Sequence, residues 1–146
     1  MKELKFSKEI NAPIQKVWDI LWNEDTYGKW TRFFTEGSRM ESDWQVGGRT
    51  VFLDPDNNGM IATITELDVP HKVYFSHQGH IIKGVEDTTS DEVKAFAGAM
   101  EKYDLEEKDG IIYLEMSVEV FDDFEQMMIN GFTKGIAEVK RLAEEG

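Results

Sequence analysis

The stretch DDFEQMMINGFTKGIAEVKRLAEE, residues Asp122–Glu145, decides the fold that we predict for this chain. Its apolar residues recur close to every 3.6 positions, which is typical of one long amphipathic helix. Gly131 and Gly135 lie within the apolar stripe, where each destabilises a helix by about 1 kcal/mol relative to alanine. The two glycines therefore predict either a close backbone contact or an unfilled space beneath the helix. We place these residues on the stripe: Phe121, Phe124, Met128, Phe132, Val139 and Leu142.

Most of the chain before this helix alternates between apolar and polar residues, which indicates strands with one buried face. Turn sequences at Pro55–Gly59 and Asp109-Gly110 separate neighbouring strands, so adjacent strands should be antiparallel. One strand should carry Met40, Ser42 and Trp44 on a single face. We expect the other strands at Lys2–Ile10, Arg49–Asp54, Met60–Asp68, Lys72–Gln78, Ala99–Glu107 and Ile111–Val120.

Two short helices should follow the first strand. Asn11-Ala12-Pro13 is a helix start, and Ile14, Val17, Trp18 and Leu21 then recur at helical spacing. A second helical piece should cover Glu24–Lys29. The predicted fold class is α+β: a curved antiparallel sheet of about six or seven strands, wrapped on the long C-terminal helix.

Composition limits the possible functions. The chain has 146 residues, which we interpret as a single domain over 1–146, and a formal net charge of −13. Such an acidic chain is a poor match for nucleic acid or an anionic membrane surface. The chain contains no cysteine, so disulfides and thiolate chemistry are excluded. There is no run of about 20 apolar residues and no signal-peptide pattern, so we expect no membrane insertion and a cytoplasmic location.

Several motifs together resemble the START-like superfamily, also called SRPBCC or Bet v 1-like. They are Asn11-Ala12-Pro13, Val17-Trp18, Trp44-Gln45-Val46-Gly47-Gly48, Gly59 and Gly131-Phe132. The later motifs look like the branch related to the C-terminal domain of the activator of Hsp90 ATPase, in which members commonly carry tryptophan where this chain has Phe132. The resemblance implies a helix-grip fold with a cavity between the sheet and the C-terminal helix. It also implies functions that differ widely between members.

The predicted ligand-binding residues would line such a cavity or guard its entrance. An apolar wall with few polar groups suits a small hydrophobic ligand. The alternative is a filled core in which the glycines only permit close approach. The candidates are Trp30, Phe34, His77, Tyr103, Phe124, Met128, Gly131, Phe132 and Gly135.

His77 and Glu101 are weak catalytic candidates, because strict alternation along their strands would point both toward the interior beside Tyr103. The alternative is a hydrogen-bonded structural histidine. We predict no metal site: His77 and His80 would point to opposite faces of a strand, and Asp54–Gly59 looks like a hairpin rather than a calcium loop. No cofactor motif is present.

The leading hypothesis is a non-enzymatic, monomeric START-like protein that binds a small hydrophobic or amphipathic molecule. One alternative is a chaperone regulator of the Hsp90-activator kind, and another is a cyclase or hydrolase of small molecules. The polar segment 83–95, with a short helix expected at about Ser90–Phe96, is either a lid over the cavity or a solvated loop.

Overall fold

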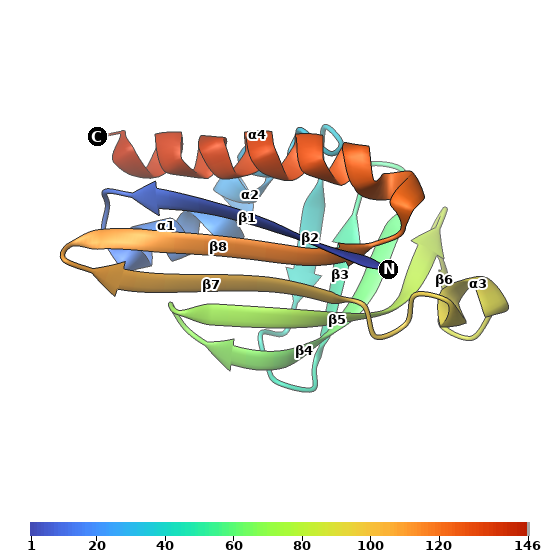
Figure 1. The fold of residues 1–146 in the computed structure, drawn as a ribbon. Coiled ribbons are helices and arrows are strands. Elements are labelled where there is room, and N and C mark those ends of the chain that lie inside the picture. Colours follow the sequence, from blue (N-terminus) through green and yellow to red (C-terminus); the bar gives the residue numbers. More distant parts are fainter. Residues whose placement is uncertain (146) are drawn as a thin grey trace.

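The computed structural model describes residues 1–145, in which a long C-terminal helix lies along a curved antiparallel sheet (Figure 1). Within these residues the sheet has eight strands in the order β1-β8-β7-β5-β4-β3-β2, and β6 pairs with β5. The strands are β1 (Lys2–Ile10), β2 (Arg39–Ser42), β3 (Arg49–Leu53), β4 (Gly59–Asp68), β5 (Lys72–Ile82), β6 (Val85–Asp87), β7 (Met100–Lys108) and β8 (Ile111–Val120). The helices are α1 (Ile14–Trp22), α2 (Glu24–Thr31), α3 (Asp91–Lys94), a 3-10 turn at Asp122–Phe124 and α4 (Glu125–Glu144).

The predicted α+β helix-grip fold is confirmed, with one strand more than expected. The additional strand is β6, which lies in the segment that we expected to be irregular. Residues Lys83 and Gly84 both have positive φ, 51° and 82°, which is the backbone of a tight type I′ hairpin. This turn extends β5 to Ile82 and folds Val85–Asp87 back onto it. In the remainder of that segment, Ser90 caps α3 by accepting a hydrogen bond from the Val93 amide.

The two ends of the described chain pack together. Strand β1 pairs with β8 over its whole length, from Lys2 opposite Val120 to Ile10 opposite Ile112. Helix α4 runs beside β1, and α1 and α2 lie beneath it on the same side of the sheet (Figure 1). The main core therefore lies between the helices α1, α2 and α4 and the concave face of the sheet.

The start of the C-terminal helix differs from the prediction. Phe121 and Phe124 are 36% and 49% exposed, so their assignment to the buried stripe is wrong. The chain passes through a 3-10 turn before α4 begins at Glu125, and residues in that turn do not share the angular phase of the α-helix. Met128 and Leu142 are only half-buried. The buried face of α4 is made by Gly131, Phe132, Gly135, Ile136, Glu138, Val139 and Ala143.

The expected space beneath the two glycines is filled, and that prediction is wrong. A Cβ atom added to Gly131 would lie 2.4 Å from the ring of Phe34, and one added to Gly135 would lie 2.8 Å from the carbonyl oxygen of Trp30. The glycines therefore let α2 and the segment after it approach α4 closely. The alternative that we considered, close approach in a packed core, is what the structure contains.

Candidate functional site

A chain of three polar side chains crosses the concave face of the sheet. His77 lies on β5, and Glu101 and Tyr103 lie on the adjacent strand β7, where Glu101 is opposite Phe75. The Nε2 atom of His77 is 3.0 Å from Oε1 of Glu101, and the Tyr103 hydroxyl donates a hydrogen bond to Oε2 of the same carboxylate. His77 is 7% and Tyr103 is 1% exposed. The alternation of residues along both strands predicted this grouping, and the structure brings the three together.

Burial and the carboxylate of Glu101 together determine the electrostatics of this group. Burial raises the pKa of Tyr103 well above its ordinary value, and the nearby negative charge of Glu101 raises it further. The same two causes, in the same order, raise the pKa of Tyr27 on α2. Tyr103 therefore remains a hydrogen-bond donor at any physiological pH. With Glu101 ionised, Nε2 of His77 also donates, and the Nδ1 atom, which is buried, has no partner among the described residues.

A second group of side chains forms a concave aromatic pocket of about 260 Å³. Its walls include Trp18 and Trp22 on α1 and Trp44 in the loop between β2 and β3. The Nε1 atom of Trp22 is buried and has no hydrogen-bond partner within residues 1–145. An unpaired buried donor of this kind costs about 1–3 kcal/mol. The remaining lining residues are Gln15, Asp19, Asn23, Leu67 and Val69.

Trp44 reaches this pocket through an unusual backbone conformation. Its φ of 54° lies in the left-handed region, which large side chains rarely occupy. The Trp44 amide donates a hydrogen bond of 3.0 Å to the Ser42 hydroxyl, and this bond fixes the end of β2. The predicted strand therefore stops at Ser42 rather than continuing to Trp44, and the left-handed residue turns the indole toward α1. Backbone strain at a bulky residue is found preferentially at functional sites.

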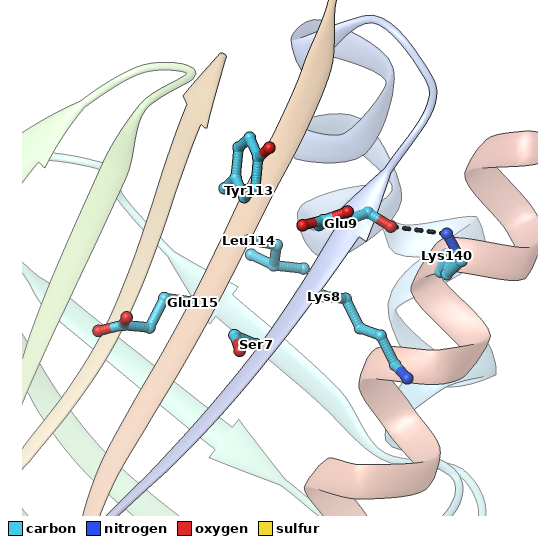
Figure 2. Close-up of a pocket in the computed structure, with 7 residues that line it drawn as sticks. All are labelled: Ser7, Lys8, Glu9, Tyr113, Leu114, Glu115 and Lys140. Carbon is cyan, nitrogen blue, oxygen red and sulfur yellow. Dashed lines mark hydrogen bonds between the residues drawn. The ribbon is translucent and has the colours of Figure 1, made fainter. Parts of the chain in front are cut away.

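A larger concavity, of about 590 Å³, lies beside the β1 edge of the sheet (Figure 2). The Nζ atom of Lys140 donates a hydrogen bond of 2.6 Å to the carbonyl oxygen of Glu9, as the dashed line in Figure 2 shows. This contact holds α4 over part of the exposed β1 edge, which protects that edge from pairing with another strand. None of the ligand-binding residues predicted from the sequence lines it. The lining residues are Ser7, Lys8, Glu9, Tyr113, Leu114, Glu115 and Lys140.

The sequence reasoning missed one buried charge. Glu138 on α4 is 7% exposed and accepts hydrogen bonds from Arg141 on the same helix, at 2.6 and 3.0 Å, and from Arg32 beyond α2, at 2.8 Å. The two bonds from Arg141, and then the one from Arg32, lower the pKa of Glu138 to about 2. The three-residue spacing of Glu138 and Arg141 along the helix could have indicated an ion pair between them. This cluster ties α4 to the end of α2.

The predicted ligand-binding residues fall into three places. Trp30, Phe34, Gly131, Phe132 and Gly135 pack against one another under α4. His77 and Tyr103 belong to the polar group around Glu101, while Phe124 is exposed and Met128 half-buried at the start of α4. The prediction did not include Trp18, Trp22 and Trp44. Trp18 and Trp22 are four residues apart on α1, and this spacing was a usable signal for an aromatic face.

Metal binding has no support in the geometry. Across residues 1–145, no group of three or more histidine, aspartate or glutamate side chains is close enough to share a metal ion. The carboxylate of Asp54 instead accepts hydrogen bonds from the amides of Asp56 and Asn58, at 2.8 and 2.9 Å, as expected for a hairpin turn. No helix in this part of the chain is both long and apolar enough to cross a bilayer.

The fold and the sequence together define the class of protein. Residues 11–141 match the family of activator of Hsp90 ATPase homolog 1-like proteins, and the chain belongs to that family. The resemblance to the Hsp90-activator branch of the START-like superfamily is thereby confirmed. Membership supports a START-like ligand-binding role or an Hsp90-regulator-like role. No curated protein sequence matches this chain.

Solved structures share the fold at low sequence identity. The Aha1 dimer of Colwellia psychrerythraea has a TM-score of 0.72 and 14% identity, covering 100% of this chain and 98% of the other. A protein of Chromobacterium violaceum has a TM-score of 0.68 and 14% identity, covering all of both chains. CalU16 of Micromonospora echinospora has a TM-score of 0.65 and 14% identity, covering 97% of this chain and 76% of the other. At this identity, the similarity shows the fold alone.

Proposed function

We propose that this protein binds a small apolar or amphipathic molecule in the pocket formed by Trp18, Trp22 and Trp44. The observation that carries the proposal is the concavity itself, which is lined by three tryptophans, Leu67 and Val69 and has a few polar side chains beside them. The space under Gly131 and Gly135, the site first expected, is occupied by Phe34 and Trp30.

The composition of the pocket supports the same conclusion. Small-molecule sites combine mainly apolar and aromatic walls with a few polar groups that orient the ligand. Here the three indoles, Leu67 and Val69 are the apolar wall. The polar groups are spread along α1: Gln15 in its first turn, the partly buried Asp19 further along and Asn23 at its C-terminal end. The volume of about 260 Å³ suits a molecule smaller than an ordinary drug, or the head of a longer one.

The test is native mass spectrometry of the protein purified from cells that produce it naturally, followed by extraction with organic solvent. We expect a small molecule to accompany the wild-type protein and to be lost from Trp44→Ala. Tyr113→Ala is the matched control, since Tyr113 is an exposed aromatic residue on β8 that does not line this pocket.

Two results would contradict the proposal. One is a wild-type protein that is repeatedly recovered without a ligand and whose tryptophan fluorescence no compound in a diverse library changes. The other is a bound molecule that Trp44→Ala retains as well as Tyr113→Ala does.

A second candidate function is regulation of an Hsp90-type chaperone. It is favoured by the family and by Phe121, Phe124 and Met127, which are 36%, 49% and 47% exposed around the start of α4. Apolar side chains gathered on a surface are typical of protein contacts. The test is the ATPase rate of the Hsp90 from the same organism with and without this protein. An unchanged rate, with no complex in a pull-down, removes this candidate.

An enzymatic role would use the 3.0 Å contact between His77 and Glu101. A substrate would have to reach His77, which lines neither of the two pockets described above. His77→Ala and Glu101→Gln test this role directly: any turnover that both variants retain at the wild-type rate does not depend on the pair.

A further inference from the structure

Three large apolar side chains are exposed where β8 passes into α4. Phe121, Phe124 and Met127 follow one another at intervals of three residues, and the Phe124 amide donates a hydrogen bond of 3.0 Å to the Phe121 carbonyl oxygen. Side chains three positions apart lie on one side of a helical turn. The three side chains therefore form one stripe, about 10 Å long, which we call the 121–127 stripe.

The described part of the chain leaves this stripe open to solvent. About half of the surface of Phe124 and of Met127 is exposed, and more than a third of that of Phe121. Single exposed apolar residues are ordinary, but a contiguous group of them is typical of contact with another molecule. Phenylalanine and methionine are also enriched at protein interfaces, and methionine adapts its shape to different partners.

The charge around the stripe has one sign. Residues 119–133 include four acidic residues and no basic one. The Oε1 atom of Glu125 is 2.9 Å from Nζ of Lys2, so that carboxylate already has a partner. Asp122 and Asp123 are exposed, and neither forms an ion pair with another described residue. The surface beside the stripe therefore favours a positively charged partner.

The same charge disfavours two other occupants. A second copy of this chain carries the same acidic residues and a net charge of −13, so two such stripes would repel each other when face to face. An anionic membrane surface would be repelled for the same reason. The occupant that matches the surface is a protein segment that carries apolar and basic side chains together.

The length of the stripe matches a helical segment. Apolar residues at positions i, i+3 or i+4 and i+7 of an α-helix also span about 10 Å. Lysine or arginine side chains beside them would lie against Asp122 and Asp123. We infer that the 121–127 stripe docks a basic amphipathic helix of a partner protein. This inference goes beyond the proposed small-molecule function and does not depend on the tryptophan pocket.

The probe is a short fluorescent peptide of leucine and lysine whose leucines recur at helical spacing. One comparison peptide has glutamate in place of each lysine, and another has the basic composition in an order that forms no leucine face. Fluorescence anisotropy measures binding at low and at physiological salt. We expect the basic amphipathic peptide to bind at least about tenfold more tightly than either comparison peptide, and added salt to weaken its binding.

One pair of double variants tests the apolar stripe. Phe124→Ser with Met127→Ser removes two of its three side chains and should weaken the basic amphipathic peptide by about tenfold or more. The matched control is Ile82→Ser with Val85→Ser, which removes two exposed apolar side chains from the β5–β6 hairpin and should leave the affinity unchanged. Circular dichroism checks that each variant is folded.

A second pair of double variants tests the charge. Asp122→Asn with Asp123→Asn should weaken the same peptide severalfold and reduce the effect of salt on its binding. The control is Glu106→Gln with Glu107→Gln, which makes the same change in net charge at exposed positions on β7, at the end of the β7–β8 ladder away from the stripe. This control should have a much smaller effect.

Four results would overturn the inference. Equal binding of the two basic peptides would show attraction by charge alone, and no binding at millimolar concentration would show that the stripe docks no such helix. Binding that survives Phe124→Ser with Met127→Ser unchanged would place the peptide elsewhere. A wild-type dimer that this double variant dissociates in analytical ultracentrifugation would assign the stripe to a second copy. The mass spectrometry of the tryptophan pocket involves none of these residues, so either proposal can fail alone.

Discussion

The ring of Phe34 occupies the space into which a side chain at Gly131 would extend: a Cβ atom there would lie 2.4 Å from two of the Phe34 ring carbons. Phe34 packs edge-on against Phe132, with ring centroids 4.8 Å apart, and Phe132 stacks on Phe6 of β1 at 5.1 Å. The missing side chain at position 131 therefore allows a row of three aromatic rings to connect the segment after α2, helix α4 and the edge strand.

Gly131→Ala should destabilise the protein by about 1 kcal/mol, because displacing the Phe34 ring outweighs the gain in helix propensity. In a Phe34→Ala background the ring is absent, and the same substitution should stabilise the protein by up to about 1 kcal/mol. Urea denaturation of the four proteins in this double-mutant cycle measures the coupling. A stabilising Gly131→Ala in the wild-type background would mean that the space is open after all.

Gly135→Ala should lower the free energy of unfolding further than Gly131→Ala does, by about 1–3 kcal/mol. The obstacle here is the carbonyl oxygen of Trp30, 2.8 Å from the added Cβ, and a backbone atom cannot move aside as a side chain can. Phe34→Ala should give no rescue in this case. The check is the free energy of unfolding of the single and double variants, and a full rescue would contradict the packing described for α2.

The lowered pKa of Glu138 predicts how the stability of the protein depends on pH. Its pKa is lowered from 4.5 to about 2, so its contribution is fully present above pH 4.5 and is lost as the pH falls toward 2. Glu138→Gln should lower the free energy of unfolding at neutral pH by about 1–3 kcal/mol, and the difference from wild type should shrink below pH 4.5. Urea midpoints over this range test it. Glu107→Gln, at an exposed position on β7, is the control and should match wild type throughout.

The group around Glu101 should behave as a coupled unit. Glu101→Gln replaces one acceptor oxygen by a donor that faces either His77 or Tyr103, and we expect a loss of about 1–3 kcal/mol. Tyr103→Phe should cost about 1 kcal/mol, and the double variant should lose less than the sum of the two. Thermal and urea unfolding measure these values. Strict additivity would show that the hydrogen bonds do not form in solution.

Trp44 allows the left-handed backbone to be tested separately from the indole. Trp44→Gly and Trp44→Ala both remove the ring, but only glycine adopts a φ of 54° without strain. The glycine variant should therefore be the more stable by about 1 kcal/mol. The reverse order in urea denaturation would mean that residue 44 has an ordinary backbone conformation.

Local sequence patterns were sufficient to predict most of the fold. The bounds expected for the first and last strands, Lys2–Ile10 and Ile111–Val120, are those found, because alternation and turn residues act over a few positions. β6 was missed because Val85–Asp87 has no alternating apolar pattern and depends on the Lys83-Gly84 turn. Phe121 fits the helical period, and only the 3-10 turn after it removes it from the buried face.

The candidate site was less accessible to sequence reasoning. His77, Glu101 and Tyr103 were grouped correctly because strand periodicity determines which face a residue occupies. The tryptophan pocket was not found, because it depends on a loop residue with positive φ meeting one face of α1, which is a property of tertiary structure. The sequence also left open whether Gly131 faces a close contact or an unfilled space. The structure answers this through Phe34, a residue far away in the sequence.

The pairing of β1 with β8 has a consequence for biosynthesis. Lys2 is synthesised more than a hundred residues before its partner Val120. At about 5–20 residues per second, β1 waits on the order of ten seconds before it can pair. During translation the nascent chain therefore carries an unpaired strand with apolar residues such as Leu4 and Phe6, which is the kind of segment that chaperones shield.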